Sequence, residues 1–372
     1  MDFDLSAEQR LLEESIDSFF AGSFPLSRVR NCYDAQLGPL DDLGALHLSE
    51  ILIPEAYGGG GGTILDVAVA AERLGAAVAP GPFLGRVLAS YAITVAGSDE
   101  QRARWLPKLA SGERRVTIAV GEPGDRWSLD DLRMGGHRLT GEKRYVLAGD
   151  GVDAAVVVLT DGLALVDLGA DGLTVTNTEV LDRTRPMVSL AFDGPDHERL
   201  GGGGGAPGAE AAERVLQLGA VLVAADAYGG AAKCLEMAVA YSQQREQFGT
   251  TIGHFQAIQH QLADMAVDVL PSRGMYWYAA HAMDCGLDDA GGFASLAKAH
   301  ITERYVAAAR RTIEVHGGIG YTWESDLHFF LRRAIFDRAY LGSPEMHRQR
   351  RAHSQLTQDQ LAQANGHLAR AK

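Results

Sequence analysis

The chain has 372 residues, of which 46% are hydrophobic and 22% are charged, a balance typical of a soluble globular protein with two or three domains. Its 48 acidic residues outnumber the 34 basic ones, and the net charge of −14 argues against nucleic acid or an anionic membrane as a partner. The three cysteines are far apart in an order that forms no disulfide or metal pattern, and the acidic N-terminal sequence has no apolar signal-peptide core. We therefore expect a cytoplasmic protein.

The first part of the chain, residues 1–112, predicts an α-helical domain. Ser6 precedes a run of leucine, isoleucine and phenylalanine at helical spacing and is a candidate N-cap. A glycine run at 58–62 interrupts the pattern, and Thr63 opens the next helix. The helices expected after that break span residues 63–74, 84–96 and 99–109.

The middle part, residues 113–205, contains short apolar runs separated by Gly, Asp and Pro, which predicts a small domain of antiparallel strands. A second glycine run at 201–205 is interpreted as a turn or linker, since it has neither the spacing nor the lysine of a phosphate-binding loop. The strands are expected at residues 116–120, 144–147, 154–159, 163–166 and 187–192.

The last part, residues 206–372, is predicted to be helical again. The segment 210–241 is apolar nearly all round, which indicates a buried helix, and its apolar stretch is too short to span a bilayer. Residues 255–269 carry an apolar seam of three-four spacing, and two further helices are expected at 293–313 and 323–340. The histidines of this part show no metal-site spacing, so we expect no metal.

Several segments resemble the acyl-CoA dehydrogenase family and occur in the family's order. They are residues 53–59 (Ile-Pro-Glu-Ala-Tyr-Gly-Gly), 105–112 (Trp-Leu-Pro-Lys-Leu-Ala-Ser-Gly), 245–249 (Arg-Glu-Gln-Phe-Gly) with its continuation to 265, and 315–324. The resemblance implies an α+β multidomain protein with an N-terminal α-helical domain, a middle antiparallel β-barrel and a C-terminal four-helix bundle. It also implies FAD, an acyl-CoA substrate, a tetramer and an electron-transfer flavoprotein as acceptor.

In this family a carboxylate removes the α-proton of an acyl-CoA thioester while the β-hydride passes to the flavin, and the product is a 2-enoyl-CoA. The resemblance assigns the ADP half of a FAD held by the neighbouring subunit to a set of residues at 245–256 and 317–320. The guanidinium and the glycine backbone suit a pyrophosphate. The expected cofactor-binding residues are Arg245, Phe248, Gln256, Gly317, Gly318 and Gly320.

Each of these residues also has a plainer interpretation. Arg245 could pair with Glu246 on the surface, and the glycines could simply end a helix. Glu314 stands where the family usually has Gln, and a carboxylate there repels a pyrophosphate unless it points away or pairs with a neighbouring arginine. The order of the motifs favours the cofactor interpretation.

Groups that the family places against its own flavin ring are missing from this chain. Tyr145 stands at the family's Trp position, Leu147 at a hydroxyl position, and Gly121 replaces the Thr of a Thr-Glu-Pro loop. Leucine and glycine side chains cannot donate a hydrogen bond to a flavin.

The catalytic base is missing as well. The two positions where members carry the glutamate are Leu341 and Gly219 here, and neither residue can take a proton. The nearest acids are Asp226, interpreted as paired to an arginine or a helix N-terminus at a subunit contact rather than as a base, and Glu345, interpreted as solvated or ion-paired.

The losses suggest a division of labour between chains. The pattern resembles the catalytically degenerate β-type subunit of actinobacterial α2β2 acyl-CoA dehydrogenases, many of which oxidise steroid side-chain CoA thioesters. The prediction is a subunit that completes the FAD site of a second dehydrogenase chain. The alternatives are a self-sufficient homotetramer with a relocated base, and a non-catalytic scaffold subunit.

Overall fold

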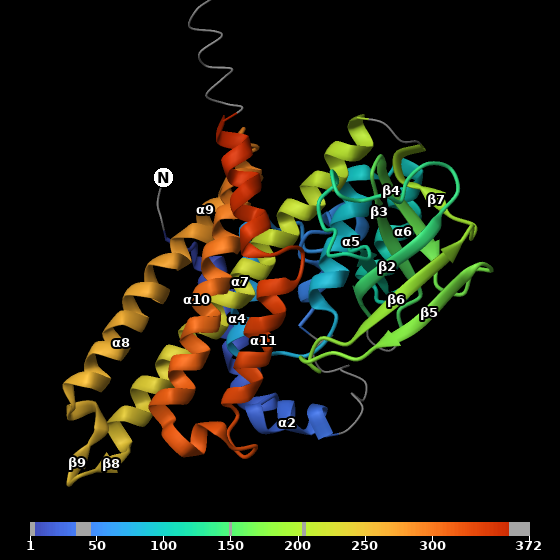
Figure 1. The fold of residues 1–372 in the computed structure, drawn as a ribbon. Coiled ribbons are helices and arrows are strands. Elements are labelled where there is room, and N and C mark those ends of the chain that lie inside the picture. Colours follow the sequence, from blue (N-terminus) through green and yellow to red (C-terminus); the bar gives the residue numbers. More distant parts are fainter. Residues whose placement is uncertain (1–3, 35–45, 149–150, 203–205, 357–372) are drawn as a thin grey trace, which may run out of the picture.

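The computed structural model describes residues 4–34, 46–148, 151–202 and 206–356, and the predicted order of helical, β and helical parts is confirmed (Figure 1). Residues 203–205 of the second glycine run and the C-terminal residues 357–372 of the predicted last domain lie outside the described residues. Figure 1 shows the helical bundle on one side and the strands on the other, with helices of the N-terminal part between them.

The N-terminal part is helical, and the predicted caps are present. Ser6 accepts a hydrogen bond from the Gln9 backbone N–H at 3.2 Å, and Thr63 caps the helix after the glycine run in the same way. A capped start matters because the first N–H groups of a helix have no partner within it. The elements are α1 (Ala7–Ser23), α2 (Leu26–Asp34), η1 (Leu48–Glu50), η2 (Glu55–Tyr57), α4 (Ile64–Ala76), α5 (Phe83–Ala96) and α6 (Asp99–Ala110).

The middle part forms two sheets that face each other. One has the order β1-β3-β4-β7 and the other the order β2-β6-β5. All pairs are antiparallel except β1 with β3, which are parallel, a departure from the expected all-antiparallel domain. The strands are β1 (Val116–Ala119), β2 (Thr140–Leu147), β3 (Ala154–Leu159), β4 (Gly162–Asp167), β5 (Leu173–Thr178), β6 (Met187–Asp193) and β7 (Glu198–Arg199).

Strand β3 shows why its sheet lies between two hydrophobic cores. Val156 and Val158 face the helical core, while Ala155 and Val157 lie in the smaller core between the two sheets. Successive side chains of a strand point to opposite faces, so a strand that is apolar throughout is buried on both. Strand β5 was not predicted, because it is largely exposed and polar and gives no apolar run.

The C-terminal part is the predicted four-helix bundle, in which the consecutive helices α8 and α9 together form one of the four members. Short helix η5 (Leu270–Ser272) contains a proline and joins α8 (Gln256–Val269) to α9 (Arg273–Asp284). The remaining members are α7 (Ala206–Gln244), α10 (Ala290–His316) and α11 (Leu327–Ala339). η3 (Leu200–Gly202) precedes α7, and between the helices lie the hairpin β8 (Glu246–Gln247) and β9 (Thr250–Thr251), η4 (Ile252–His254) and η6 (Gly317–Tyr321).

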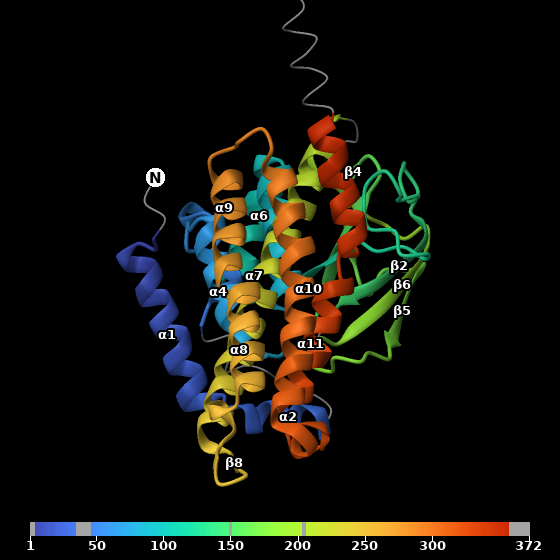
Figure 2. The ribbon, with the colours of Figure 1, turned by 60° about the vertical axis from the view of Figure 1, so that its left-hand side comes forward.

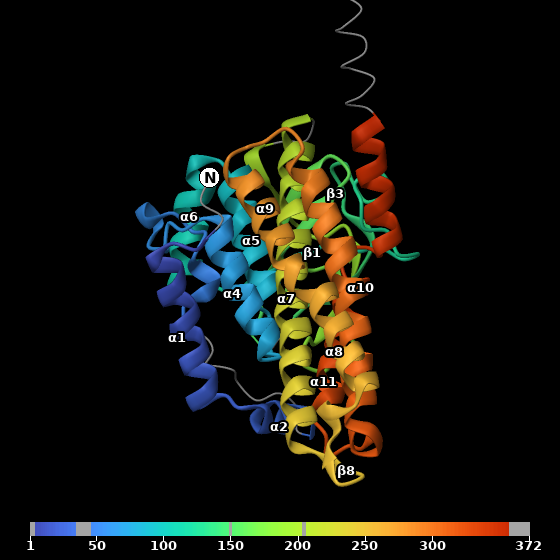
Figure 3. The same cartoon turned by 90° about the vertical axis from the view of Figure 1, so that its left-hand side faces the viewer.

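Helix α7 is the axis of the molecule. It packs against α4 and α5 of the N-terminal part and against α8, α9, α10 and α11, and Figure 3 shows it inside the bundle. An 18-residue window of α7 is apolar enough to cross a membrane, but 89% of that window is buried within the protein. Helix α7 is therefore the buried core helix that its apolar sequence predicts.

Candidate active site and cofactor surface

The two positions assigned to the catalytic base meet at one point in the structure. Leu341 follows α11 and Gly219 lies in α7, and a Cβ built on Gly219 would be 2.4 Å from Leu341 Cδ1. Leu341 is 4% exposed, and Leu88 of α5 closes the same place. The convergence fits the idea that a glutamate could serve from either position, but here the meeting point is hydrocarbon with no group that can accept a proton.

Two buried basic side chains hold the turn that carries Leu341. Lys298 Nζ donates hydrogen bonds to the carbonyls of Arg338, at 3.0 Å, and of Gly342. His347 Nε2 donates to the Leu341 carbonyl at 3.0 Å. Burial lowers the pKa of Lys298 to about 7 and that of His347 to about 3. This support could not be expected from the sequence, because lysine is rarely fully buried.

The acid candidates have structural roles instead. Asp226 accepts hydrogen bonds from Arg185 Nη2 at 3.0 Å and from Arg333 Nη1 at 3.1 Å, and it is 6% exposed. Arg333 also donates from Nε to Asp182 at 2.7 Å. This buried network joins the β part to α7 and α11, so the expected arginine pairing of Asp226 is present. Its oxygens are committed to guanidinium groups and are not available to a substrate proton.

Glu345 is exposed and accepts a hydrogen bond from Arg338 Nη2 at 3.0 Å. Hydrogen bonds from its own backbone N–H and from the Ser343 hydroxyl lower the pKa of Glu345, which makes it a weaker base. The interpretation of Glu345 as an ion-paired surface residue agrees with these contacts.

The residues assigned to the ADP half of FAD lie together at one end of the bundle. Tyr241 near the end of α7 stacks on His316 at the end of α10 with ring centroids 4.1 Å apart, which brings Arg245 and Gly317 to the same end. Figures 1 and 2 show this end, marked by β8, projecting away from the sheets. The chain therefore presents these groups far from its own β part.

These groups are exposed and have few partners in their own chain. Within the described residues the Arg245 side chain is exposed and has no ion pair with Glu246, against the plainer interpretation. Phe248 is 93% exposed with φ +55°, a backbone conformation that a bulky residue rarely adopts. Gln256 begins α8 and is exposed. Glu314 is exposed too, so it points to solvent rather than into the protein.

The three glycines of the motif differ from one another. A Cβ on Gly318 would meet no atom within 4 Å, so the packing of this chain gives no reason for a glycine there. Gly317 ends α10 with φ +62°, as the helix-end interpretation expects. A Cβ on Gly320 would be 2.6 Å from the Ile313 carbonyl oxygen, so internal packing explains that glycine. Gly318 is the glycine that suits close approach by another molecule.

The positions assigned to the flavin ring do not fit such a ring. Trp127 is 6% exposed and stacks on Tyr145 with centroids 5.8 Å apart, while the Tyr340 ring lies 5.4 Å away on its edge. A Cβ on Gly121 would be 2.9 Å from two atoms of the Trp127 ring. Leu147 is 1% exposed. The FAD that the resemblance implies therefore fits this chain in one part only. Its ADP half suits the exposed residues at the end of the bundle, whereas side chains of this chain fill the positions assigned to its isoalloxazine ring.

A buried ion pair fixes the loop that carries Trp127. Lys143 Nζ donates to Glu122 Oε1 at 2.8 Å, and Glu122 also accepts from the backbone N–H groups of Arg133 and Met134 at 2.8 and 3.0 Å. Burial lowers the pKa of Lys143 to about 8. Burial alone would raise the pKa of Glu122, but the hydrogen bond and charge of Lys143 lower it. The Glu-Pro pair of the loop thus has a structural role.

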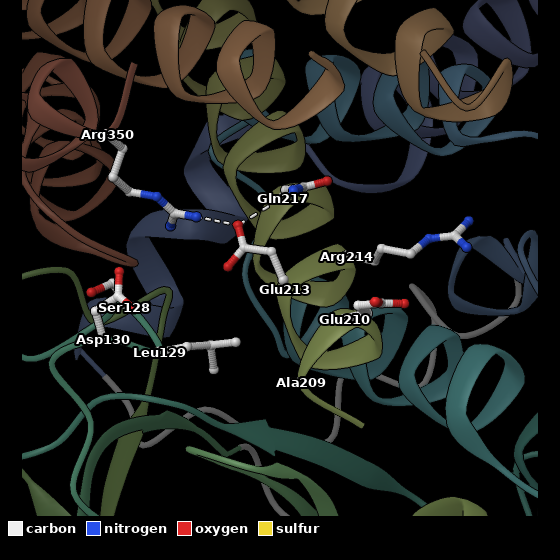
Figure 4. A pocket seen from close by; sticks show the side chains of 9 residues that line it. All are labelled: Ser128, Leu129, Asp130, Ala209, Glu210, Glu213, Arg214, Gln217 and Arg350. Atoms are coloured by element: carbon white, nitrogen blue, oxygen red, sulfur yellow. Dashed lines mark hydrogen bonds and ion pairs between the residues drawn. The ribbon is translucent and has the colours of Figure 1, made fainter. Parts of the chain in front are cut away.

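A pocket of about 510 Å³ opens beside this loop, between the β part and the start of α7 (Figure 4). Figure 4 shows Arg350 reaching Glu213, with Gln217 bonded to the same carboxylate at 3.3 Å and Arg214 pointing away. Ser128 and its neighbours line the other wall. None of the predicted base or cofactor residues lines this pocket, and two of its charged residues, Arg350 and Glu213, form an ion pair.

Comparisons with known proteins agree with the fold and the motifs. The description "Acyl-CoA dehydrogenase, N-terminal domain" matches residues 6–113, and "Acyl-CoA dehydrogenase, C-terminal domain" matches residues 206–356. An acyl-CoA dehydrogenase of Bacillus subtilis (strain 168) is 30% identical over 332 residues, which cover 82% of this chain and 86% of that protein.

Two other relatives have names that mention a subtype. Acyl-CoA dehydrogenase IpdE2 of Mycolicibacterium smegmatis is 29% identical over 349 residues, which cover 91% of this chain and 96% of that protein. A solved structure of a variant of the Tcur3481-Tcur3483 steroid ACAD has a TM-score of 0.86 at 29% identity, and covers 95% of this chain and 98% of that one.

Proposed function

Because the chain belongs to the acyl-CoA dehydrogenase family, whose cofactor is FAD, we propose that it is one subunit of a heteromeric FAD-dependent acyl-CoA dehydrogenase. In this proposal a second dehydrogenase chain supplies the base and the ring site, and this chain completes the ADP end of that partner's FAD. The reaction is α,β-dehydrogenation of an acyl-CoA thioester, in an α2β2 assembly with an electron-transfer flavoprotein as acceptor.

The observation that carries the proposal is the contrast between the two halves of the cofactor. Leu341 and Gly219 leave no base, and Trp127 stands at the ring place. Arg245 and Gly318 remain exposed at the far end of the bundle, open to another molecule. A guanidinium and an unobstructed backbone suit a pyrophosphate, so these residues would bind and orient the ADP half while taking no part in proton or hydride transfer.

Names of relatives support the substrate class and the setting. One solved relative is a steroid ACAD whose name joins two proteins, Tcur3481 and Tcur3483. We extend to this chain a steroid-derived CoA thioester as substrate and a cytoplasmic location, the latter in keeping with its buried core helix α7.

The self-sufficient homotetramer is the weaker alternative, because it needs a carboxylate near Leu341. Asp226 is bonded to two arginines and Glu345 is exposed and bonded to Arg338. The scaffold alternative requires that the exposed end of the bundle bind no cofactor. The flavin content of the complex therefore distinguishes it from the proposal.

The direct test is the visible spectrum of the purified chain, alone and after co-expression with an acyl-CoA dehydrogenase chain that carries the catalytic glutamate. The chain alone should be colourless at 450 nm, and the complex should hold FAD that bleaches when an acyl-CoA is added. A yellow chain that bleaches alone would support the homotetramer. If the partner has the same FAD content and the same activity with and without this chain, the proposal is wrong and the scaffold role is supported.

Arg245→Ala sharpens the test. Loss of a charge-assisted phosphate contact costs about 1.5–3 kcal/mol, so FAD affinity of the complex should fall at least ~10-fold. The matched control is Arg138→Ala on the edge of the β part, where Arg138 pairs with Asp193 at 3.3 Å and is well exposed. Equal FAD content in both variants would remove Arg245 from the cofactor site.

A further inference from the structure

Two contacts between a glycine and a large side chain fill the positions that the resemblance assigns to the flavin ring and the catalytic base, which we call the centre of this chain. Gly121 lies against the Trp127 ring, and Gly219 lies against Leu341. In both contacts the glycine stands where the family resemblance expects a functional side chain. Trp127 comes from the same loop as Gly121, whereas Leu341 comes from the turn after α11, far from Gly219 in the sequence. Neither glycine has a positive φ, so backbone conformation does not explain them. They are explained by the space that Trp127 and Leu341 need.

Buried hydrogen bonds fix the backbone segments that carry Trp127 and Leu341. The loop of Trp127 is fixed by the Glu122–Lys143 pair, and its backbone N–H and C=O groups at Glu122 and Arg126 bond to each other at 3.1 and 3.4 Å. The turn of Leu341 is fixed by Lys298 and His347. Because hydrogen bonds fix the backbone of both turns, displacing Trp127 or Leu341 would cost considerable free energy. These two side chains are therefore a packed part of the core.

We propose that the catalytic centre of this chain has been rebuilt as hydrophobic core, and that the Trp127 indole stands in the place of a flavin ring. Tyr145 stacks on the indole and Tyr340 meets it edge-on, and both would contact a flavin ring in its stead. The inference rests on the proposed function for its meaning, since a chain closed in this way works only through a partner's flavin. Its test uses this chain alone and is independent of any partner.

The test is binding of lumiflavin, an isoalloxazine without the ribityl-ADP tail, to the full chain. Wild type should give no saturable quenching of flavin fluorescence. Trp127→Ala should bind one lumiflavin per chain, at least ~10-fold tighter than wild type, with quenching by the two tyrosine rings. Trp105→Ala, which removes a partly buried tryptophan from α6, is the control and should behave as wild type.

Saturable binding by wild type as tight as by Trp127→Ala would overturn the proposal, as would a folded Trp127→Ala that binds no lumiflavin. If Trp127→Ala does not fold, Trp127→Leu keeps an apolar side chain while still removing most of the ring, and the same two outcomes apply to it. Neither result depends on whether a partner chain takes up FAD, so failure here is distinct from failure of the proposed subunit role.

The second contact is tested by a double-mutant cycle. Gly219→Ala should lower the Tm of wild type, because its methyl group would overlap Leu341, and should lower it less in a Leu341→Ala background. The same cycle applies to Gly121→Ala with Trp127→Ala. Additive Tm changes in both cycles would overturn the claim that the glycines exist to admit these large residues.

Discussion

The centre of this chain and the far end of its bundle have opposite characters. At the centre, large side chains are buried against glycines and the turns that carry them are held by buried lysines. At the end, the Phe248 ring is 93% exposed and lies edge-on to Phe255, and a Cβ on Gly318 would meet no atom within 4 Å. The family resemblance assigns cofactor contacts to both regions. Only the end keeps groups that can make such contacts, and this difference is what the proposed sharing of a FAD between two chains would require.

The strongest test of this comparison sets two aromatic residues against each other. Trp127→Ala should cost about 3–5 kcal/mol of unfolding free energy, because it leaves a cavity in a pinned core. Phe248→Ala should stay within ~0.5 kcal/mol, since that ring is 93% exposed. Urea denaturation of the isolated chain measures both, and similar losses in the two variants would mean that the regions do not differ as described.

A smaller effect is expected from the pH dependence of the Lys298 support. The unfolded chain holds the Lys298 proton up to about pH 10.4, whereas burial lowers the pKa in the folded chain to about 7. The unfolded state therefore binds more protons in this window, and stability should rise with pH between these values.

Lys298→Met removes that contribution. The stability of wild type relative to the variant should rise by more than ~1 kcal/mol from pH 7 to 10, since one pKa unit corresponds to about 1.4 kcal/mol. Denaturation curves at several pH values check this. Parallel profiles for the two proteins would show that Lys298 titrates alike in the folded and unfolded chain.

The smallest effect on stability is expected for Gly318→Ala, whose methyl group would meet nothing within 4 Å. Its unfolding free energy should change by less than ~0.5 kcal/mol while the FAD content of the complex falls. Gly320→Ala is the matched control, because its methyl group would press on the Ile313 carbonyl and should cost about 1–3 kcal/mol. Full FAD occupancy in a stable Gly318→Ala complex would contradict the cofactor role of this glycine.

Much of the fold could be predicted because local patterns carry it. The cap at Ser6 and the apolar run of β3 each define an element within a few residues. The two positions assigned to the base, Leu341 and Gly219, could be located by counting from the motifs. Strand β5 was not predicted because it is exposed and polar. The helix expected to begin at residue 323 begins at Leu327, because η6 and the turn after it occupy the preceding residues.

The closure of the centre could not be predicted. Trp127 lies in an ordinary loop, and its partners Tyr145 and Tyr340 come from a distant strand and from the end of α11. Arg333 and Asp182 look like surface residues in the sequence, yet both are buried and bonded to each other. Such contacts depend on how segments far apart in the sequence meet in three dimensions.

The contact between Gly219 and Leu341 also has an evolutionary consequence. A glutamate introduced at 219 would collide with Leu341, and a glutamate at 341 would bury an unpaired carboxylate against Leu88 and the bare backbone of α7. A glutamate at either position therefore requires a change at the other position as well. Under the proposed subunit role, this mutual constraint would keep the centre closed and maintain the dependence on a second chain.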